Sequence, residues 1–306
     1  MSQRDVQNRI GSVKNIQKIT RAMEMVAAAR LRRAEQRIES LRPYAGAIRR
    51  MTRQAAAAAG GEVGAQPILT EREEVKSVGI MLVTADRGLA GAFNSQILRA
   101  GIRAAVDHER ESHKVVFFAS GRRGVSSLTF RDREAQGAYT GFTDRPAYAN
   151  AREIAEDLMT AYIDGDVDKV EIYYNGYISP LSQVVRGETL LPLQQATLLE
   201  GTEDDDDKDD SPEEEPESGH HALVEYEPDP AEILQRLVPD YVEISIYRAL
   251  LESTASEHGA RMTAMRNASE NAGEVIEDLT LEMNRARQAE ITQEIMEVVA
   301  GAESLV

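Results

Sequence analysis

Apolar residues recur at spacings of three and four through most of residues 3–58, and few turn-forming residues interrupt them. The series opens with three residues and continues in two runs: Val6, Ile10 and Val13, then Ile16, Ile19, Met23 and Val26, then Ala27, Leu31, Ala34, Ile38, Leu41, Ala45 and Ile48. This spacing is typical of a coiled-coil seam, here with two shifts of phase. We therefore expect one long helix, kinked near Pro43 and ended by the glycines at 60–64.

A similar pattern covers residues 229–306. Its first residues, "DPAE", offer an N-cap, a proline for the first turn and a carboxylate for a capping box. Apolar residues then continue at spacings of three and four almost to the end of the chain, with a kink expected at Pro239. Because long helices need a partner for their apolar face, we expect the two helices to pair in antiparallel fashion, with residues 291–305 beside the start of the first.

The pattern between the two helices has a different period. Runs typical of buried strands, at about 78–84 and 114–119, alternate with helical stretches at about 94–109 and 147–163. Two further strands, "KVEIYYNGYI" and "SQVVRGETLLPL", follow with a hairpin-like connection. Strands that alternate with helices indicate a mainly parallel, layered α/β domain. The expected fold is mixed α+β and α/β, with a Rossmann-like domain inserted between the two helices of a long antiparallel coiled coil.

Charge is distributed unevenly along the chain, whose formal net charge is −17. Residues 1–53 hold 13 Lys or Arg and 4 Asp or Glu, whereas residues 203–217 hold 11 acidic residues and 1 Lys. So acidic a segment cannot bury apolar surface and predicts a disordered, solvated loop. We therefore divide the chain into four parts: an N-terminal shaft helix (1–58), an inserted α/β domain (75–195), an acidic loop (197–222) and a C-terminal shaft helix (229–306).

Little in the sequence points to catalysis. The absence of Cys excludes disulfides, thiolate metal sites and a Cys nucleophile. The turn "TADRGLAGAFN" at 84–94 joins a strand to a helix, and such a turn can bind phosphate through backbone amides. It has neither the GxxxxGK[ST] nor the GxGxxG spacing, so a tight connection is the preferred interpretation. The histidines have no zinc-ligand spacing on one helix face: His108, His113, His220, His221 and His258. We expect no catalytic residue, no cofactor and no metal.

The basic first helix has two interpretations from its residues alone. Its arginines surround the apolar seam without interleaved aromatic residues, and the negative charge of the whole chain opposes approach to a polyanion, so we do not expect nucleic-acid binding. A solvated flank of a coiled coil is the simpler interpretation, and a basic face for an acidic protein partner is the sharper one. No stretch approaches the roughly 20 apolar residues of a membrane-spanning helix, so no direct membrane insertion is expected.

Four blocks of sequence, in this order, carry a family resemblance. They are "IQKITRAMEMVAAARLRRAE", "TADRGLAGAFN", "VEYEPDP" and "RQAEITQEIMEVVAGA". Together they closely resemble the gamma subunit of F-type ATP synthase over residues 2–304, except in the acidic loop, which is longer than is usual there and has no counterpart to the paired cysteines of the chloroplast branch.

The resemblance implies a non-catalytic rotor subunit that couples rotation of a membrane c-ring to ATP synthesis or hydrolysis in a ring of alpha and beta subunits, with the epsilon subunit beside its foot. The absence of a presequence leads us to expect a bacterial complex, peripheral to the plasma membrane on its cytoplasmic side. The alternative is a coiled-coil scaffold whose α/β domain binds a nucleotide.

The resemblance also implies partner-binding residues. Met23 lies in the block that faces an acidic helix-turn-helix of the beta subunits, and Arg30, Arg32 and Arg33 supply the basic charge that complements it. Three residues of the last block and one upstream match shaft positions that contact beta-subunit loops: Gln288, Thr292, Glu294 and Arg261. Tyr226 and Glu227 match the foot, near the epsilon subunit and the c-ring.

Overall fold

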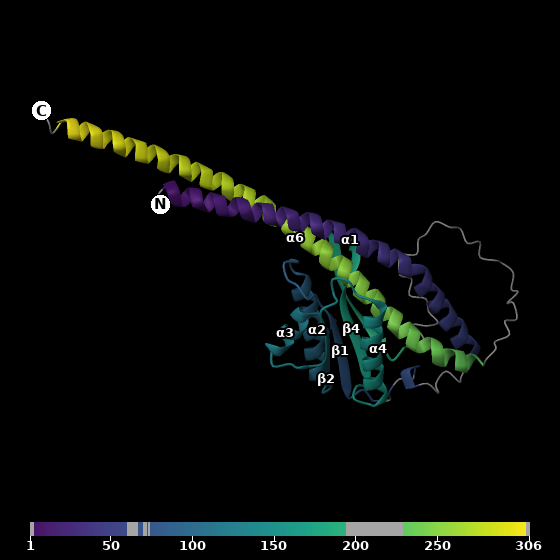
Figure 1. Ribbon diagram of the computed structural model, residues 1–306. Helices are drawn as coiled ribbons and strands as arrows, with labels where there is room; N and C mark the ends of the chain where they lie inside the picture. The colour runs from purple at the N-terminus through teal and green to yellow at the C-terminus, as the bar shows by residue number, and fades with distance from the viewer. Residues whose placement is uncertain (1–2, 60–66, 70–71, 73, 194–228, 304–306) are drawn as a thin grey trace.

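Two long helices dominate the structure, a computed structural model that describes residues 3–59, 67–69, 72, 74–193 and 229–303. Helix α1 spans Gln3–Ala59 and helix α6 spans Pro230–Glu303. They lie side by side in opposite directions, so that the N-terminus and the C-terminus lie at the same end of the rod (Figure 1). The expected coiled coil with an inserted Rossmann-like domain is therefore confirmed. Both helices continue through their internal prolines, and the kinks expected there stay a prediction.

The first turns of α1 pack against residues 276–283 of α6, about five turns before the end of that helix. Val6, Ile10 and Leu279 form one buried cluster, with Val13, Ile276 and Met283 packed against it. The expected pairing of residues 291–305 with the start of α1 is therefore wrong. Helix α6 has 74 residues and α1 has 57, and the longer helix extends past the N-terminus (Figure 1).

The seam of α1 also runs through polar residues that periodicity alone did not select. Gln17 donates a hydrogen bond to the Ser269 carbonyl oxygen at 3.3 Å, and Thr20 is buried. The seam thus keeps spacings of four and three from Val13 through Gln17, Thr20, Glu24, Ala27, Leu31 and Ala34. The two phase shifts inferred from the apolar residues do not occur, and Ile16, Ile19 and Val26 are more than half exposed on another face.

The inserted domain contains one five-stranded sheet with strand order β3-β2-β1-β4-β5. The first four strands in that order are parallel, and β5 is antiparallel to β4. The strands are β1 (Ser77–Val83), β2 (Lys114–Ser120), β3 (Ala135–Tyr139), β4 (Lys169–Ser179) and β5 (Ser182–Leu191). Short β3 was not expected, because "AQGAY" has too few apolar residues to indicate a strand.

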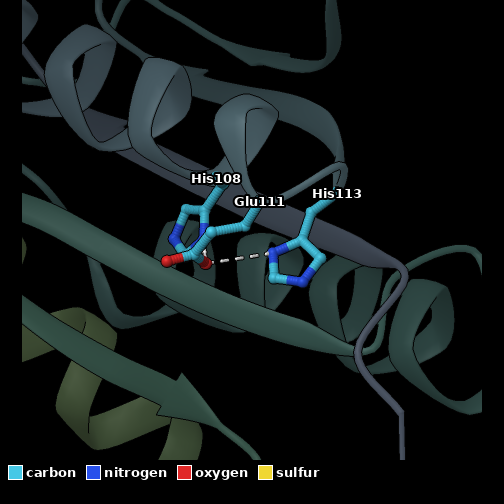
Figure 2. A group of neighbouring side chains, drawn as sticks. All are labelled: His108, Glu111 and His113. Atoms are coloured by element: carbon cyan, nitrogen blue, oxygen red, sulfur yellow. Dashed lines mark ion pairs between the residues drawn. The ribbon is translucent and has the colours of Figure 1, made fainter.

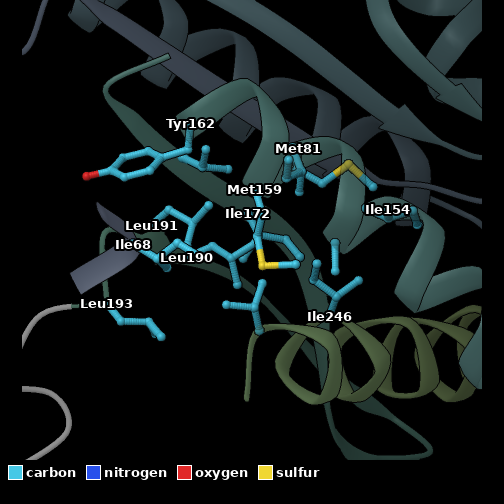
Figure 3. Close-up of a cluster of buried hydrophobic side chains, with 14 of the residues drawn as sticks. Ile68, Met81, Ile154, Met159, Tyr162, Ile172, Leu190, Leu191, Leu193 and Ile246 are labelled. Carbon is cyan, nitrogen blue, oxygen red and sulfur yellow. The ribbon is translucent and has the colours of Figure 1, made fainter. Parts of the chain in front are cut away.

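Helices cover both faces of this sheet. The helices are α2 (Phe93–Arg110), α3 (Arg122–Thr129) and α4 (Tyr148–Ile163), with a short 3-10 turn, η2, at Pro67–Leu69. Helices α2 and α3 lie on one side, and α4 and the first half of α6 lie on the other (Figure 1). The larger core fills this second side, where Met81, Ile154 and Ile246 come from the sheet, α4 and α6 (Figure 3). One element of the shaft is thus part of the domain core.

Candidate functional site

The loop after β1 is closed by the carboxylate of Asp86. Its oxygens accept hydrogen bonds from the backbone amides of Arg122 at 3.1 Å and Gly141 at 2.9 Å, and from the Thr143 hydroxyl at 3.0 Å. Burial opposes ionisation, but these hydrogen bonds prevail and lower the pKa of Asp86. The carboxylate therefore occupies the amide at the start of α3 that an anionic ligand would use. Within the stretch itself, Asn94 Oδ1 accepts a hydrogen bond from the Ala85 amide at 2.9 Å and Asn94 Nδ2 donates to the Arg87 carbonyl oxygen at 3.3 Å, so "TADRGLAGAFN" is a tight connection, as expected.

A row of polar residues on α6 faces the carboxyl ends of the parallel strands. The Thr254 hydroxyl donates to the Thr143 carbonyl oxygen at 2.9 Å, and the Ser256 hydroxyl donates to the Asn175 carbonyl oxygen at 3.1 Å. Both hydroxyls are buried with the residues around them. The first bond satisfies a carbonyl group of the loop after β3 and the second reaches strand β4, so together they attach the domain directly to the shaft.

Arg261 extends this attachment to the loop after β1. Its Nη2 donates to the Gly88 carbonyl oxygen at 3.1 Å and lies 2.5 Å from Glu257 Oε1, one turn earlier on α6. Burial raises the pKa of Glu257, and the charge of Arg261 opposes that rise. Arg261, expected to contact a partner, is thus largely buried and also bonded within its own chain.

Arg30 belongs to the same junction. It forms an ion pair with Asp144, the residue after Thr143 in the loop that follows β3. Asp144 Oδ1 also lies 3.6 Å from Nε2 of His258. Burial lowers the pKa of His258 to about 4; Asp144 opposes this, and Arg261 and Arg30 add to it. The histidine is therefore neutral at pH 7. α1, α6 and the domain thus meet in one cluster of polar and charged groups, which we call the junction. Its residues are Arg30, Asp86, Asp144, Glu257, His258 and Arg261.

A groove beside the junction brings together three of the residues expected to bind partners. Met23, Arg30 and Arg261 all line it, and its volume is about 480 Å³. The remaining lining is apolar or basic: Ile19, Ala22, Val26, Ala27, Arg87, Gly88, Leu89, Arg123 and His258. We call it the basic groove. The side chains of Ile19, Val26 and Leu89 are between 54% and 65% exposed there, so their apolar surface has no cover within the described part of the chain.

The other expected residues lie elsewhere. Arg32 and Arg33 are exposed on α1, one turn beyond the basic groove. Gln288, Thr292 and Glu294 are exposed on the part of α6 that extends past the N-terminus. They share this tip with four exposed apolar residues: Ile291, Ile295, Met296 and Val298. Tyr226 and Glu227 lie outside the described residues.

Sequence reasoning selected Arg30 and Arg261 as partner contacts, but not the other residues that build the junction. Asp86, Asp144, Glu257 and His258 are neither part of the apolar seam nor spaced as a known catalytic motif. The available signal was the polar run "STASEH" at 253–258, which interrupts the apolar residues that a long amphipathic helix would bury at spacings of three and four. Such a run inside a core-facing helix indicates contact with loop backbone.

Shape and site define a class of protein: a paired-helix shaft with a sheet domain clamped to its side, apolar surface left open along the shaft, and no nucleotide-binding motif in the sequence. Comparison with known proteins agrees. The family model described as ATP synthase matches residues 2–305. Two ATP synthase gamma chains, from Rubrobacter xylanophilus and Moorella thermoacetica, are 41% and 42% identical to this chain, each over 99% of it and 98% of its own length.

The chain therefore belongs to the ATP synthase gamma-chain family, and the expected role as a non-catalytic rotor subunit is confirmed. A solved central stalk of the Tetrahymena thermophila mitochondrial ATP synthase is 27% identical, with a TM-score of 0.60 over 82% of this chain and 99% of that one. A chain of the Euglena gracilis mitochondrial enzyme shares the fold, with a TM-score of 0.67 at 16% identity over 99% of this chain and 94% of that one. Within the described residues, no helix has the length and apolar character to cross a membrane.

Proposed function

We propose that the chain transmits torque between a membrane c-ring, against its α/β domain, and a ring of alpha and beta subunits around its paired helices. The single observation that carries this proposal is the continuity of α6. One helix, Pro230–Glu303, contributes to the domain core, forms the junction, pairs with α1 and then ends in an exposed apolar tip. A force on the domain is therefore delivered to the tip through one covalent helix.

The junction makes the domain and the shaft turn together. A rotor needs a connection that resists twisting about the shaft axis, and a single helix alone would provide little. Here Arg30 on α1 and Arg261 on α6 hold two different loops of the domain, one through Asp144 and one through Gly88. The Arg30–Asp144 pair is partly exposed and the Arg261–Glu257 pair is buried, and charge-assisted hydrogen bonds of this kind have a defined geometry, which suits this purpose.

Two surfaces are suited to the alpha and beta subunits. The basic groove presents the half-buried Met23 and several exposed apolar side chains among arginines, so it complements an acidic and partly apolar segment such as the family's beta subunits present. Arg32 and Arg33 extend its positive charge. The tip, with Gln288, Thr292 and Glu294 among apolar neighbours, suits the closed top of the ring, where Ile295 and Val298 would lose contact with water.

The chemistry of ATP belongs to the beta subunits in this proposal. The gamma chain changes their state by presenting different faces as it turns, because beyond the domain α1 covers only one side of α6. We further propose that the complex is bacterial and that this subunit works at the cytoplasmic side of the plasma membrane, held there by the c-ring and the epsilon subunit. Bacterial relatives that match over nearly full length support this assignment.

Reconstitution tests the role and the tip together. Ile295→Asp with Val298→Asp introduces two charges where the ring should close on apolar surface, so we expect little change in folding and a clear loss of assembly with the alpha/beta ring. Ile163→Asp, at an equally exposed position on α4, is the matched control and should assemble like the parent. Size-exclusion chromatography and ATP hydrolysis measure both. Equal assembly of all three proteins would contradict the proposed tip contact, and nucleotide binding by the isolated chain would favour the scaffold alternative.

A further inference from the structure

Two histidines and a glutamate meet where α2 ends and β2 begins (Figure 2). The chain leaves α2 through a reversal in which Ser112 has a φ of 70°. The amide of His113 donates to the His108 carbonyl oxygen at 3.0 Å, and the amide of Ser112 donates to that of Glu109 at 3.1 Å. This pair of bonds is the Schellman motif of helix ends. It turns His113 back beside His108, which explains why a search along one helix face did not connect them.

The three side chains direct ligand atoms toward one point. Glu111 Oε2 lies 3.8 Å from Nδ1 of His108 and 3.5 Å from Nδ1 of His113, and one ligand atom from each of the three residues lies within 4.8 Å of the others. Both Nδ1 atoms are buried, and neither has a hydrogen-bond partner among the described residues. A buried nitrogen without a partner is unfavourable, so two that face the same carboxylate need an explanation.

A second carboxylate fixes the orientation of His108. Its Nε2 lies 3.2 Å from Glu171 Oε1 on β4, and that oxygen also accepts a hydrogen bond from Lys169 Nζ at 2.8 Å. The Tyr173 hydroxyl donates to the other oxygen of Glu171 at 2.8 Å. With its Nε2 proton directed at Glu171, the His108 ring presents the lone pair of Nδ1 to Glu111. Metal-binding histidines are commonly oriented by a carboxylate in this way.

We propose that His108 Nδ1, His113 Nδ1 and Glu111 Oε2 bind Zn²⁺. Two imidazoles and one carboxylate are a ligand set that zinc accepts, with water in the fourth position. Two carboxylates, those of Glu111 and Glu171, lie at the site, and Lys169 pairs with the second. The ligand atoms must close in to reach zinc–ligand distances of about 2.0–2.2 Å. Glu111 can make that adjustment because its side chain is 66% exposed.

The bound ion would join the end of α2 to the start of β2. The site lies at the amino ends of the parallel strands, because β2 begins at Lys114. The junction lies at their carboxyl ends, where α6 contacts the loops. The site is therefore separate from the shaft and from the junction. Zinc would stabilise the amino end of the sheet without altering the contacts between the domain and the shaft.

Isothermal titration of the full chain with Zn²⁺, after treatment with a chelator, tests the site. We expect one site per chain in the parent, roughly 10–100-fold weaker binding in Glu171→Gln and at least as large a loss in Glu111→Gln and His113→Gln. His220→Asn with His221→Asn is the control. It removes two consecutive histidines that lie outside the described residues, and it should bind Zn²⁺ as the parent does. Co²⁺ should give the visible absorption of a four-coordinate ion in the parent and not in Glu111→Gln.

Thermal unfolding separates binding from folding. Without metal, Glu111→Gln should melt like the parent, because Glu111 is exposed, and zinc should raise the melting temperature of the parent alone. The proposal is overturned if Glu111→Gln and His113→Gln bind Zn²⁺ as the parent does. It is also overturned if the parent shows no site, or if the site disappears with the His220 and His221 substitutions.

Discussion

Arg261 on α6 donates a hydrogen bond to the carbonyl oxygen of Gly88 at 3.1 Å, although 173 positions separate the two residues. The same guanidinium contacts Glu257, whose side chain is only 3% exposed. Arg261 therefore joins the shaft to the loop after β1 and neutralises a buried carboxylate at the same time. These two roles make the junction sensitive to its loss.

Replacing Arg261 with Met should destabilise the chain strongly. Removing one member of a buried ion pair leaves the other charge without compensation, which typically costs about 3–5 kcal/mol. Urea unfolding followed by circular dichroism measures the change. Arg266→Met is the matched control, because Arg266 pairs with Glu24 at 2.9 Å near the surface and its loss should cost less than about 1 kcal/mol.

A second substitution distinguishes charge from packing. Glu257→Gln added to Arg261→Met removes the uncompensated carboxylate, so the double variant should recover part of the lost free energy of unfolding. If the double variant is as unstable as Arg261→Met, the hydrogen bond to Gly88 and the packing of the side chain account for the loss, and the ion pair does not.

His258 should make stability depend on pH. Burial lowers its pKa to about 4, below the value of about 6.5 that it has in an unfolded chain. Between these values the unfolded state binds more protons than the folded state, so the contribution of His258 is complete above pH 6.5 and is lost as pH falls toward 4. The loss should reach about 3 kcal/mol at pH 4.

A comparison across pH isolates this effect. Asp144, Arg261 and Arg30 face His258, and Glu257, the preceding residue, has a raised pKa, so the parent alone would not report His258 separately. His258→Gln removes only the imidazole. We expect the difference in free energy of unfolding between parent and variant to change between pH 6.5 and pH 4, and a constant difference would show that His258 titrates normally.

Gly101 on α2 should not tolerate alanine. A Cβ atom there would lie 2.2 Å from Leu82 Cδ2, and Leu82 is fully buried on β1. Overpacking of this kind costs about 1–3 kcal/mol. Gly11 on α1 has nothing within 4 Å of the same position, so Gly11→Ala should stabilise by roughly 0.5–1 kcal/mol. Thermal unfolding should therefore move the two variants in opposite directions.

Periodicity predicted the long helices and their pairing because apolar residues at spacings of three and four form a seam along one face of a helix. It placed Leu31 and Ala34 in the seam correctly, and both are buried. It failed at Gln17 and Thr20, since a polar residue can occupy a seam position when a carbonyl oxygen is within reach: that of Ser269 on α6 for Gln17, and that of Gln17 on the same helix for Thr20. Reading the exposed Ile19 as a seam residue followed from that error.

The junction was beyond sequence reasoning for a different reason. Asp86, Asp144 and His258 come from two loops and a helix, and only the topology of the sheet brings them together. Family resemblance selected Arg30 and Arg261 as partner contacts, and the structure adds that both are already bonded within the chain. Of the three expected residues that line the basic groove, Met23 is therefore the one whose side chain is not already bonded to the domain.

The three arginines of the first helix should now separate into two kinds. Arg30 pairs with Asp144, whereas Arg32 and Arg33 are exposed. Arg30→Glu would place like charges together at the junction and should destabilise the isolated chain. Arg32→Glu with Arg33→Glu should leave the stability nearly unchanged, since exposed charges contribute about 0–1 kcal/mol each.

Assembly with the alpha/beta ring should depend on Arg32 and Arg33, although the stability of the isolated chain does not. Arg32→Glu with Arg33→Glu would turn negative charge toward the acidic segments proposed to face this helix, so binding should weaken at low salt and recover as salt rises, because screening acts over about 8 Å at physiological ionic strength. Arg42→Glu with Arg50→Glu changes the net charge equally at two other exposed positions of α1. Surface plasmon resonance at two salt concentrations would compare them. If both pairs weaken binding equally, net charge and not the place of Arg32 and Arg33 governs the association; if neither does, the basic face is only a solvated flank of the coiled coil.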